Sequence, residues 1–349
     1  MRETPSLDRY LDDWSGADVK RQAVAQTIRV IAGTGRHLSE IVAQGQLAGA
    51  IGDVVGSNSD GDAQKQLDIR ANDLLIEALI AAPVATIASE ELTAPLLTGQ
   101  DGAELCVAID PLDGSSNIDT NTSIGTIFSV LPVGQGNNGS TDSQFFQPGT
   151  RQLAAGYIIY GPQTALVLTL GEGTQIFVLD RSDFEFRLTS ANVQIPAATR
   201  EFAINASNHR FWDDHIQLYI SDCLTGEDGP RKKNFNMRWN ASLVAECHRI
   251  LSRGGIFLYP GDTRQGYQNG RLRLLYEAGP IAMLIEQAGG GASTGLARIL
   301  DIQPSDIHQR VPFIFGSKDE VEHVERRYAC EQTIGERSPL FARRGLFRA

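Results

Sequence analysis

The pattern of apolar positions in the first half of the chain predicts helices followed by strands. Apolar residues recur at helical spacing over residues 19–51, and Gly33-Thr34-Gly35 in the middle predicts a kink or a division into two helices. Residues 72–80 predict another helix, which Pro83 ends. Apolar runs then predict buried strands at 84–88, 105–109 and 124–131. Three further runs, at 165–170, 174–179 and 184–188, are joined by polar turns and predict an antiparallel meander.

The second half alternates helical and strand patterns, which is the order of an α/β fold. We expect helices at 212–224, 242–252, 277–288 and 320–331, and strands at 202–205, 256–259 and 312–315. A chain of 349 residues is longer than one core usually serves, because cores stop growing at about 250–300 residues. The proline-containing segment 194–197 is the best linker candidate, so we expect two lobes, residues 1–195 and 196–349, each with a mixed sheet flanked by helices.

Composition and charge narrow the function. The net charge of −11 disfavours nucleic acid and anionic membrane as partners, since phosphate groups repel such a surface. No apolar run is long enough to span a bilayer, and residues 1–14 lack the apolar core of a signal peptide, so we expect a cytoplasmic protein. The four cysteines are far apart in sequence, which predicts buried free thiols and neither a zinc site nor a disulfide framework.

The segment with the most chemical information is Asp110-Pro111-Leu112-Asp113-Gly114-Ser115-Ser116, which follows a predicted buried strand. Asp-Pro and Asp-Gly are also common in solvent-exposed turns, so the two dipeptides alone do not establish a site. The spacing allows both carboxylates and the Leu112 carbonyl to meet one hard cation. Gly114 and the two serines leave backbone N–H groups and hydroxyls available for a phosphate beside that cation.

Two other acidic segments are weaker signals. Glu90-Glu91 ends a predicted strand, although a Glu-Glu pair is more often solvated charge on a helix. Asp62 and Asp68 lie in what reads as a loop that leads into a helix. Together with the first segment, they supply six carboxylates.

These segments together resemble the lithium-sensitive, magnesium-dependent phosphatase superfamily, and class I fructose-1,6-bisphosphatase in particular. The string VAIDPLDGSSNID carries most of the likeness, and GDAQKQLD (61–68), SIGTIF (123–128), GGIFLYP (254–260) and RLRLLYEAGPIAMLIEQAGG (271–290) agree with it. The resemblance covers residues 19–330. It implies a layered α/β/α/β/α sugar-phosphatase fold, and a hydrolase that converts fructose 1,6-bisphosphate to fructose 6-phosphate and phosphate in gluconeogenesis or Calvin-type carbon metabolism.

The resemblance also implies roles for individual residues. Two or three Mg²⁺ ions, with Mn²⁺ or Zn²⁺ as substitutes, would be held by six groups from distant segments: Asp62, Glu90, Asp110, the Leu112 carbonyl, Asp113 and Glu277. Glu91 and Asp68 would activate water, and Asp62 would act from a loop that closes over the metals. The 1-phosphate would bind Gly114, Ser115, Ser116 and Arg273. Asp113 would also face the substrate. The distal phosphate would bind Asn205, Tyr259, Arg271 and Arg238 of the partner subunit, which implies a homotetramer.

The chain departs from the family pattern at the distal phosphate. Arg271 replaces a lysine, and Asn208 and Trp239 stand where tyrosines are usual. Sedoheptulose 1,7-bisphosphate is therefore a second candidate substrate, and an enzyme dominated by that activity is an alternative. An inositol-monophosphatase-like activity is disfavoured by the retained distal-phosphate residues. A noncatalytic sugar-phosphate sensor is disfavoured by the complete set of carboxylates.

Two regulatory features of relatives are missing from the sequence. Residues 134–149 lie where plastid relatives carry a cysteine-containing insertion, but this segment has no cysteine. Relatives that AMP inhibits bind it with a Lys-Tyr pair and an arginine, whose places here hold Glu104, Leu105 and Pro132. The sequence therefore predicts neither thiol regulation nor inhibition by AMP.

Overall fold

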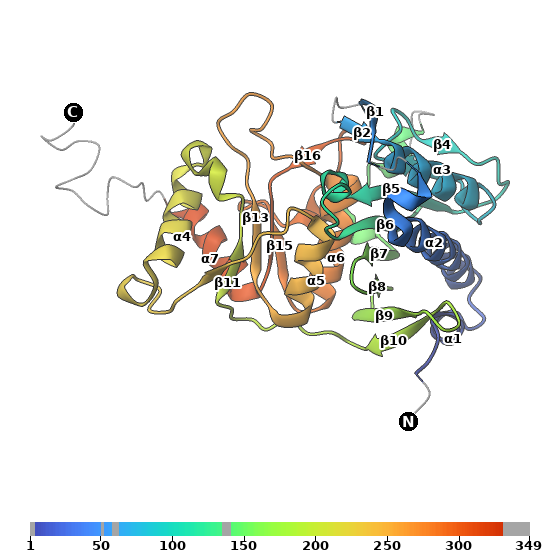
Figure 1. Cartoon of the computed structure of the whole chain (residues 1–349), viewed down its shortest axis with the longest axis horizontal. Coiled ribbons are helices and arrows are strands. Elements are labelled where there is room, and N and C mark those ends of the chain that lie inside the picture. Colours follow the sequence, from blue (N-terminus) through green and yellow to red (C-terminus); the bar gives the residue numbers. More distant parts are fainter. Residues whose placement is uncertain (1–3, 50–51, 58–62, 135–140, 331–349) are drawn as a thin grey trace, which may run out of the picture.

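The structure is a computed structural model that describes residues 4–49, 52–57, 63–134 and 141–330. Its elements form layers in the order helices, sheet, helices, sheet, helices, from right to left in Figure 1. This arrangement is the α/β class and the layering that we expected. No helix in the described part of the chain is both long enough and apolar enough to cross a membrane.

The larger sheet has eight strands in the order β10-β9-β8-β7-β6-β5-β3-β4. All neighbours are antiparallel except β3 and β5, which are parallel. Its strands are β3 (Thr86–Ser89), β4 (Leu96–Leu97), β5 (Leu105–Asp113), β6 (Ile124–Pro132), β7 (Ala154–Tyr160), β8 (Thr164–Thr169), β9 (Thr174–Asp180) and β10 (Glu185–Ser190). A separate pair, β1 (Val54–Ser57) and β2 (Ala63–Lys65), precedes helix α3.

Three N-terminal helices cover one face of this sheet: α1 (Leu7–Ser15), α2 (Val19–Gln44) and α3 (Gln66–Ile80). Their apolar side chains form one core with the facing side chains of the sheet. The alternative of two helices divided at Gly33-Thr34-Gly35 is wrong, because α2 is continuous through these residues. A Cβ atom at Gly35 would lie 2.2 Å from Cδ1 of Ile158 on β7, so this glycine allows close packing instead of ending the helix.

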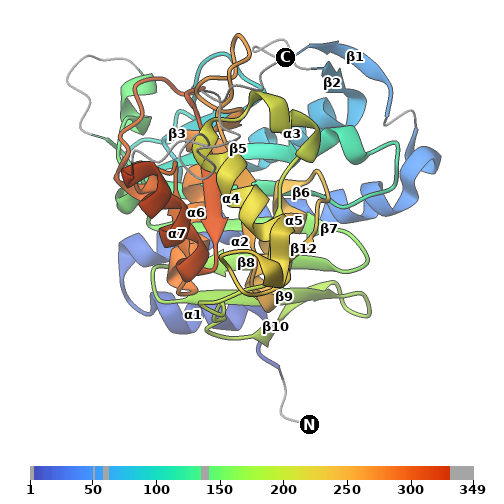
Figure 2. The same ribbon diagram turned by 90° about the vertical axis from the view of Figure 1, so that its left-hand side faces the viewer.

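The smaller sheet has five strands in the order β12-β11-β13-β17-β15. Helices α5 (Leu243–Arg253) and α6 (Gly279–Gln287) lie between the two sheets, and α4 (Asp214–Thr225) and α7 (Lys318–Ala329) cover the outer face, in front in Figure 2. The strands are β11 (Glu201–Ala203), β12 (Asn236–Met237), β13 (Ile256–Tyr259), β15 (Gly291–Ser293) and β17 (Phe313–Gly316). A short pair, β14 (Leu272–Arg273) and β16 (Arg310–Val311), lies outside this sheet.

Most predicted elements are present with shifted ends. The antiparallel meander is confirmed, and β13 has the predicted bounds. The apolar pattern missed α1 and β7. Helix α1 is short and rich in charge, with a buried stripe of few residues, whereas β7 is buried on both faces and lacks alternation.

The cysteines bear on redox control. Cys106, Cys223 and Cys247 are buried free thiols as predicted, but Cys330 is exposed, so the expectation fails there. Burial raises the pKa of the Cys106 and Cys223 thiols to about 12, which keeps them protonated and unreactive.

We expect the activity to be indifferent to dithiol reductants, because the buried thiols are neither accessible nor ionised. The measurement is the rate of phosphate release before and after treatment with reduced thioredoxin, with a Cys330→Ser variant as the control for the exposed thiol. Severalfold activation of both proteins would contradict this prediction.

Candidate active site

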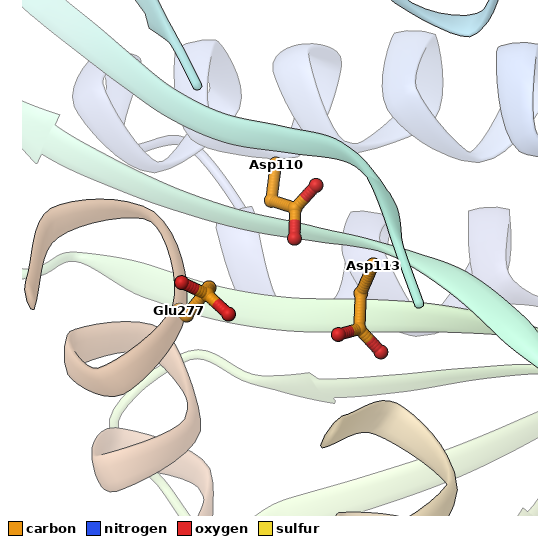
Figure 3. A group of neighbouring side chains, drawn as sticks. All are labelled: Asp110, Asp113 and Glu277. Carbon is orange, nitrogen blue, oxygen red and sulfur yellow. The ribbon is translucent and has the colours of Figure 1, made fainter. Parts of the chain in front are cut away.

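Three buried carboxylates from two distant segments face one another between the larger sheet and α6. Asp110 and Asp113 lie on β5, and Glu277 lies just before α6. Each offers an oxygen that lies within 4.8 Å of those of the other two, and Figure 3 shows the three side chains pointing toward a common space. All three are buried.

A β-bulge brings the two aspartates to the same face of the sheet. The sequence suggested that they flank a turn, but β5 continues through both of them. Asp110 pairs with Ile127 and Asp113 pairs with Gly125, so β5 has one residue more than β6 between these pairs. In a regular strand, residues three apart point to opposite faces, and the extra residue corrects this. The hydroxyl of Thr126 donates to the Pro111 carbonyl within the bulge, at 2.9 Å.

Glu277 is fixed from its own segment. It lies in a single π-helical turn, Leu274–Ala278, and its Oε2 accepts a hydrogen bond of 2.6 Å from the backbone N–H of Arg273. The Arg273 guanidinium also forms an ion pair with Glu90, which follows β3 directly. One arginine therefore connects Glu277 to a fourth acid, Glu90.

The acids raise one another's pKa values. Burial is the largest cause for each of them, since it penalises the charged form. Repulsion by Glu277 adds to the effect of burial on Glu90, and repulsion by Glu90 adds to the effect of burial on Asp110. The pKa values of Glu90 and Asp110 therefore lie well above the ordinary range. The pKa of Glu277 rises to about 7, although Arg273 lowers it in part. Four acidic groups, Glu90, Asp110, Asp113 and Glu277, therefore share the influence of two arginines, Arg273 and Arg310.

Asp68 has a similar environment. Its Oδ2 accepts a 2.7 Å hydrogen bond from the Lys65 backbone at the start of α3, as the acid of a capping box. Burial is the largest cause that raises the pKa of Asp68 to about 7, and repulsion by Glu91 adds to it. Asp68 and Glu91 are therefore near enough to interact electrostatically.

The residues fit a hard divalent cation. The donor set consists of carboxylate oxygens, which Mg²⁺ prefers. Among the described residues, Oε2 of Glu90 and Oδ1 of Asp68 are buried without a hydrogen-bond partner, which is costly unless another group compensates them. A bound cation would supply that compensation. Asp62, another predicted metal ligand, lies outside the described residues.

The raised pKa values predict how pH affects the metal-free protein. The folded state keeps protons on Asp68 and Glu277 up to about pH 7, whereas the unfolded chain releases them near pH 4. The folded state binds more protons in that window, so stability is highest below it and falls as pH rises to about 7.

We therefore expect the melting temperature in EDTA to fall by several degrees from pH 5 to pH 8, and Mg²⁺ to raise it more at pH 8 than at pH 5. The measurement is a thermal melt at each pH with and without metal. Glu277→Gln should flatten the pH dependence, and a wild-type melting temperature in EDTA that rises with pH would contradict the prediction.

The start of α5 donates hydrogen bonds to Asp113, and the sequence did not suggest this contact. Oδ2 of Asp113 accepts hydrogen bonds from the Ser242 hydroxyl at 3.2 Å and the Val244 N–H at 3.0 Å. Ser242 is the N-cap of α5, and its hydroxyl also accepts from Ala245 N–H. A serine before a helical pattern could have suggested the cap, but no sequence signal connects it to an aspartate 129 positions away.

We expect Ser242→Ala to weaken metal binding as well as the fold. Loss of the cap costs about 1 kcal/mol of stability. Loss of a hydrogen bond to a metal-binding carboxylate weakens metal affinity by about tenfold or more. The measurements are the melting temperature and a calorimetric titration with Mn²⁺. Ser242→Thr should restore both, and Ser252→Ala, on the same helix, is the control. Unchanged Mn²⁺ affinity in Ser242→Ala would contradict the prediction.

The residues predicted to bind the 1-phosphate adjoin this cluster, and some of those predicted for the distal phosphate line a separate cavity. Gly114 follows Asp113 with a left-handed φ of 78°, and Ser115 and Ser116 begin a short 3₁₀ turn. Arg273 is buried, with its backbone N–H on Glu277 and its guanidinium on Glu90. Asn205 and Asn208, which follow β11, line one small cavity with Tyr259 at the end of β13.

Three other residues of the predicted distal-phosphate site have defined partners. Trp239 stacks on Phe257, with ring centroids 5.8 Å apart and ring planes 6° apart. Arg238 is half exposed and lies 3.6 Å from the Glu201 carboxylate. The Arg271 guanidinium lies 5.0 Å from the centre of the Tyr267 ring.

Comparisons with known proteins identify the family of the chain. The family models of the N-terminal and C-terminal domains of fructose-1-6-bisphosphatase match residues 12–191 and 195–329. The class 1 fructose-1,6-bisphosphatase of Rhodopseudomonas palustris (strain BisB18) is 52% identical over all of both chains, and that of Rhizobium meliloti (strain 1021) is 54% identical over 99% of each. The crystal structure of the fructose-1,6-bisphosphatase of Leishmania major in holo form has a TM-score of 0.87 and 31% identity, over 94% of this chain and 100% of that one. The chain therefore belongs to the class 1 fructose-1,6-bisphosphatase family.

Proposed function

We propose that this protein hydrolyses fructose 1,6-bisphosphate to fructose 6-phosphate and phosphate, with Mg²⁺ as the metal. The observation that carries the proposal is the buried cluster of Asp110, Asp113 and Glu277, which Arg273 connects to a fourth acid, Glu90. A cluster with this excess of buried negative charge suits cations that bind a phosphate ester between them. The full-length similarity to fructose-1,6-bisphosphatases supports the substrate.

The acids would act as metal ligands. Glu90, Asp110, Asp113, Glu277, the Leu112 carbonyl and Asp62 would hold two or three Mg²⁺ ions. When bound, the ions neutralise the negative charge that develops on the phosphoryl group. The β5 bulge and the start of α5 orient the two aspartates, so that the ligands need little reorganisation.

The attack on phosphorus would depend on Glu91 and Asp68. A carboxylate with a pKa of about 7 is suited to accept a proton from water near neutral pH, and Asp68 has this pKa. Arg273 would donate to the 1-phosphate from its planar guanidinium. The N–H groups and hydroxyls at Gly114, Ser115 and Ser116 would bind its remaining oxygens.

The distal phosphate would bind on the other side of the sugar, at Asn205, Tyr259 and Arg271. Arg238 is half exposed beside Glu201, so its position is compatible with contact to the site of a neighbouring subunit. A homotetramer, a cytoplasmic location and the division into lobes 1–195 and 196–349 remain parts of the proposal.

The test is phosphate release from three esters at fixed Mg²⁺ and in EDTA: fructose 1,6-bisphosphate, sedoheptulose 1,7-bisphosphate and inositol 1-phosphate. We expect activity on the first, none on the last, and complete loss in EDTA. Turnover of inositol 1-phosphate at a rate equal to that of the bisphosphates would refute the substrate assignment. Equal turnover in EDTA would refute the metal.

Sedoheptulose 1,7-bisphosphate is the second candidate substrate. The observation that favours it is the altered distal site, where Asn208 lines the cavity and Trp239 stacks on Phe257. Trp239 has no hydroxyl to contact a phosphate, so binding depends more on the arginines.

A further inference from the structure

A short segment before β16 lies between the two parts of the chain that supply acids to the site. One part is the turn after β3, which carries Glu90 and Glu91. The other is β14 with the π-helical turn that carries Glu277. Residues 305–309 form hydrogen bonds with both parts. They lead directly into β16, which is labelled in Figure 1 and pairs with β14.

The turn after β3 is held from two sides. On the side of the sheet, the Glu90 N–H donates to the Ile109 carbonyl at 3.0 Å. The Leu92 N–H closes the turn by donating to the Ser89 carbonyl at 3.1 Å. On the other side, Nε2 of the His308 imidazole lies 2.9 Å from the Leu92 carbonyl oxygen. A carbonyl oxygen only accepts, so Nε2 carries the proton and donates to it. His308 therefore holds the turn beyond the end of β3.

The same histidine contacts the segment that carries Glu277. Its ring packs against the ring of Tyr276, with centroids 5.5 Å apart and ring planes at 51°. Tyr276 is fully buried and precedes Glu277 in the π-helical turn. The backbone adds a second connection, since the Leu274 N–H donates to the Gln309 carbonyl at 2.8 Å. His308 thus lies between the turn after β3 and the π-helical turn.

Hydrogen bonds within the segment fix the position of His308. Oδ1 of Asp306 accepts from the His308 N–H at 2.7 Å, and the Asp306 carbonyl accepts from the Gln309 N–H at 3.2 Å. Oε1 of Gln309 accepts from the N–H and the hydroxyl of Ser305, at 2.8 and 3.0 Å. Such bonds from side chains to nearby backbone groups stabilise turns. The fold therefore places the imidazole independently of its contact with Leu92.

The imidazole makes one side-chain hydrogen bond within the described part of the chain. Nδ1 of His308 is buried and has no partner among those residues, so the bond from Nε2 to Leu92 is the polar contact of the ring. A buried polar atom without a partner costs free energy that an apolar side chain would avoid. The bond to the turn after β3 is what an apolar residue at this position could not supply.

We propose that His308 is a positioning residue for Glu90 and Glu91. By holding the Leu92 carbonyl, it fixes the turn that presents one proposed metal ligand and one proposed water-activating acid beside Glu277. The proposal rests on the proposed function, because Glu90 and Glu91 belong to that site. Groups that orient metal ligands from outside typically contribute about 10–100-fold to metal affinity or activity.

The experiment compares His308→Leu and His308→Gln with wild type. His308→Leu removes the donor, so we expect the Kd for Mn²⁺, measured by calorimetry, to rise about tenfold and kcat for fructose 1,6-bisphosphate to fall about tenfold or more. A glutamine amide can place an N–H near the position of Nε2, so His308→Gln should bring both values to within about threefold of wild type. An unchanged Mn²⁺ Kd in His308→Leu, or equal losses in both variants, would overturn the positioning role.

His323→Leu is the matched control. His323 also packs against a tyrosine, Tyr219, with ring centroids 5.9 Å apart and ring planes at 52°, and its Nε2 also has a hydrogen bond, from Arg327. It lies on α7, on the outer face of the smaller sheet and away from the acids. His323→Leu should lower the melting temperature and leave the Mn²⁺ Kd unchanged. Equal weakening of Mn²⁺ binding in this control would show a general effect of losing a packed histidine and would refute the role of His308.

Hydrogen exchange in EDTA separates this inference from the proposed function, because it needs neither metal nor turnover. His308→Leu should speed exchange of the amides at 90–92 about fivefold, as for loss of one hydrogen bond, and leave those of β13 unchanged. If wild type bound no Mn²⁺ and hydrolysed no bisphosphate while the exchange still responded, only the proposed function would be refuted. Normal activity in wild type with unchanged exchange and Mn²⁺ Kd in His308→Leu would refute only the inference.

Discussion

Glu90→Gln should lower kcat by about a thousandfold or more at saturating Mg²⁺, because the metal-binding cluster loses a charge that contributes several kcal/mol of charge stabilisation. Glu90 is the acid that Arg273 connects to Glu277, so the substitution also removes one end of that ion pair. The measurement is kcat for fructose 1,6-bisphosphate over a range of Mg²⁺ concentrations. A variant that keeps more than a tenth of wild-type kcat would refute the role. Asp113→Ala should behave in the same way.

The melting temperature distinguishes this effect from unfolding. Glu90 repels Glu277 and Asp110 but pairs with Arg273, so the effects of its neutralisation on stability oppose each other and the melting temperature in EDTA should change little. The matched control is Glu320→Gln, which removes a buried carboxylate that pairs with Arg231 and Lys233 on the outer face of the smaller sheet. That control should lower the melting temperature and leave kcat near the wild-type value.

AMP should not inhibit this enzyme at concentrations that silence sensitive relatives. Leu105 and Pro132 are directly paired across β5 and β6, and the Glu104 carbonyl accepts from Val133 N–H, so the three replaced positions are neighbours. Glu104 is exposed and repels a phosphate, Leu105 is fully buried and Pro132 has no donor. Two charge-assisted contacts of about 1.5–3 kcal/mol each are missing, which weakens binding about a hundredfold or more.

The measurement is the initial rate at AMP concentrations up to the millimolar range. Glu104→Lys is a useful companion variant, because it restores one cation at the surface and should increase any residual inhibition. A cooperative inhibition curve with a micromolar midpoint in wild type, not competitive with substrate, would disprove the prediction.

The sequence predicted which acids form the site better than it predicted how they are arranged. Asp110, Asp113 and Glu277 could be assigned to one cluster because the motifs around them are specific, and the structure places them together. The geometry depends on features without a local signal. The low helix propensity of glycine predicts an interruption at Gly35, but the close approach of Ile158 on β7 is what requires a glycine there. Tertiary packing therefore overrides the local preference.

The sequence could not predict contacts between distant segments. The hydrogen bonds from Ser242 and Val244 to Asp113 join segments that only the fold brings together. Ala241, with a φ of 52°, lies at the same junction, where its carbonyl accepts from the Asn117 side chain at 3.1 Å. Such a conformation is strained for alanine and is kept by its surroundings.

The bulge in β5 makes the site sensitive to the number of residues in the strand as well as to their identity. Deletion of either Pro111 or Leu112 would leave every carboxylate in the sequence and restore the regular pairing with β6, and Asp110 and Asp113, then two positions apart, would still share a face. The deletion would instead remove one backbone carbonyl from between the two carboxylates, at the place where the Leu112 carbonyl is proposed to bind metal. The bulge thus determines how many backbone groups lie beside the carboxylates, and alignments that shift by one position here would pair residues that have no structural equivalence.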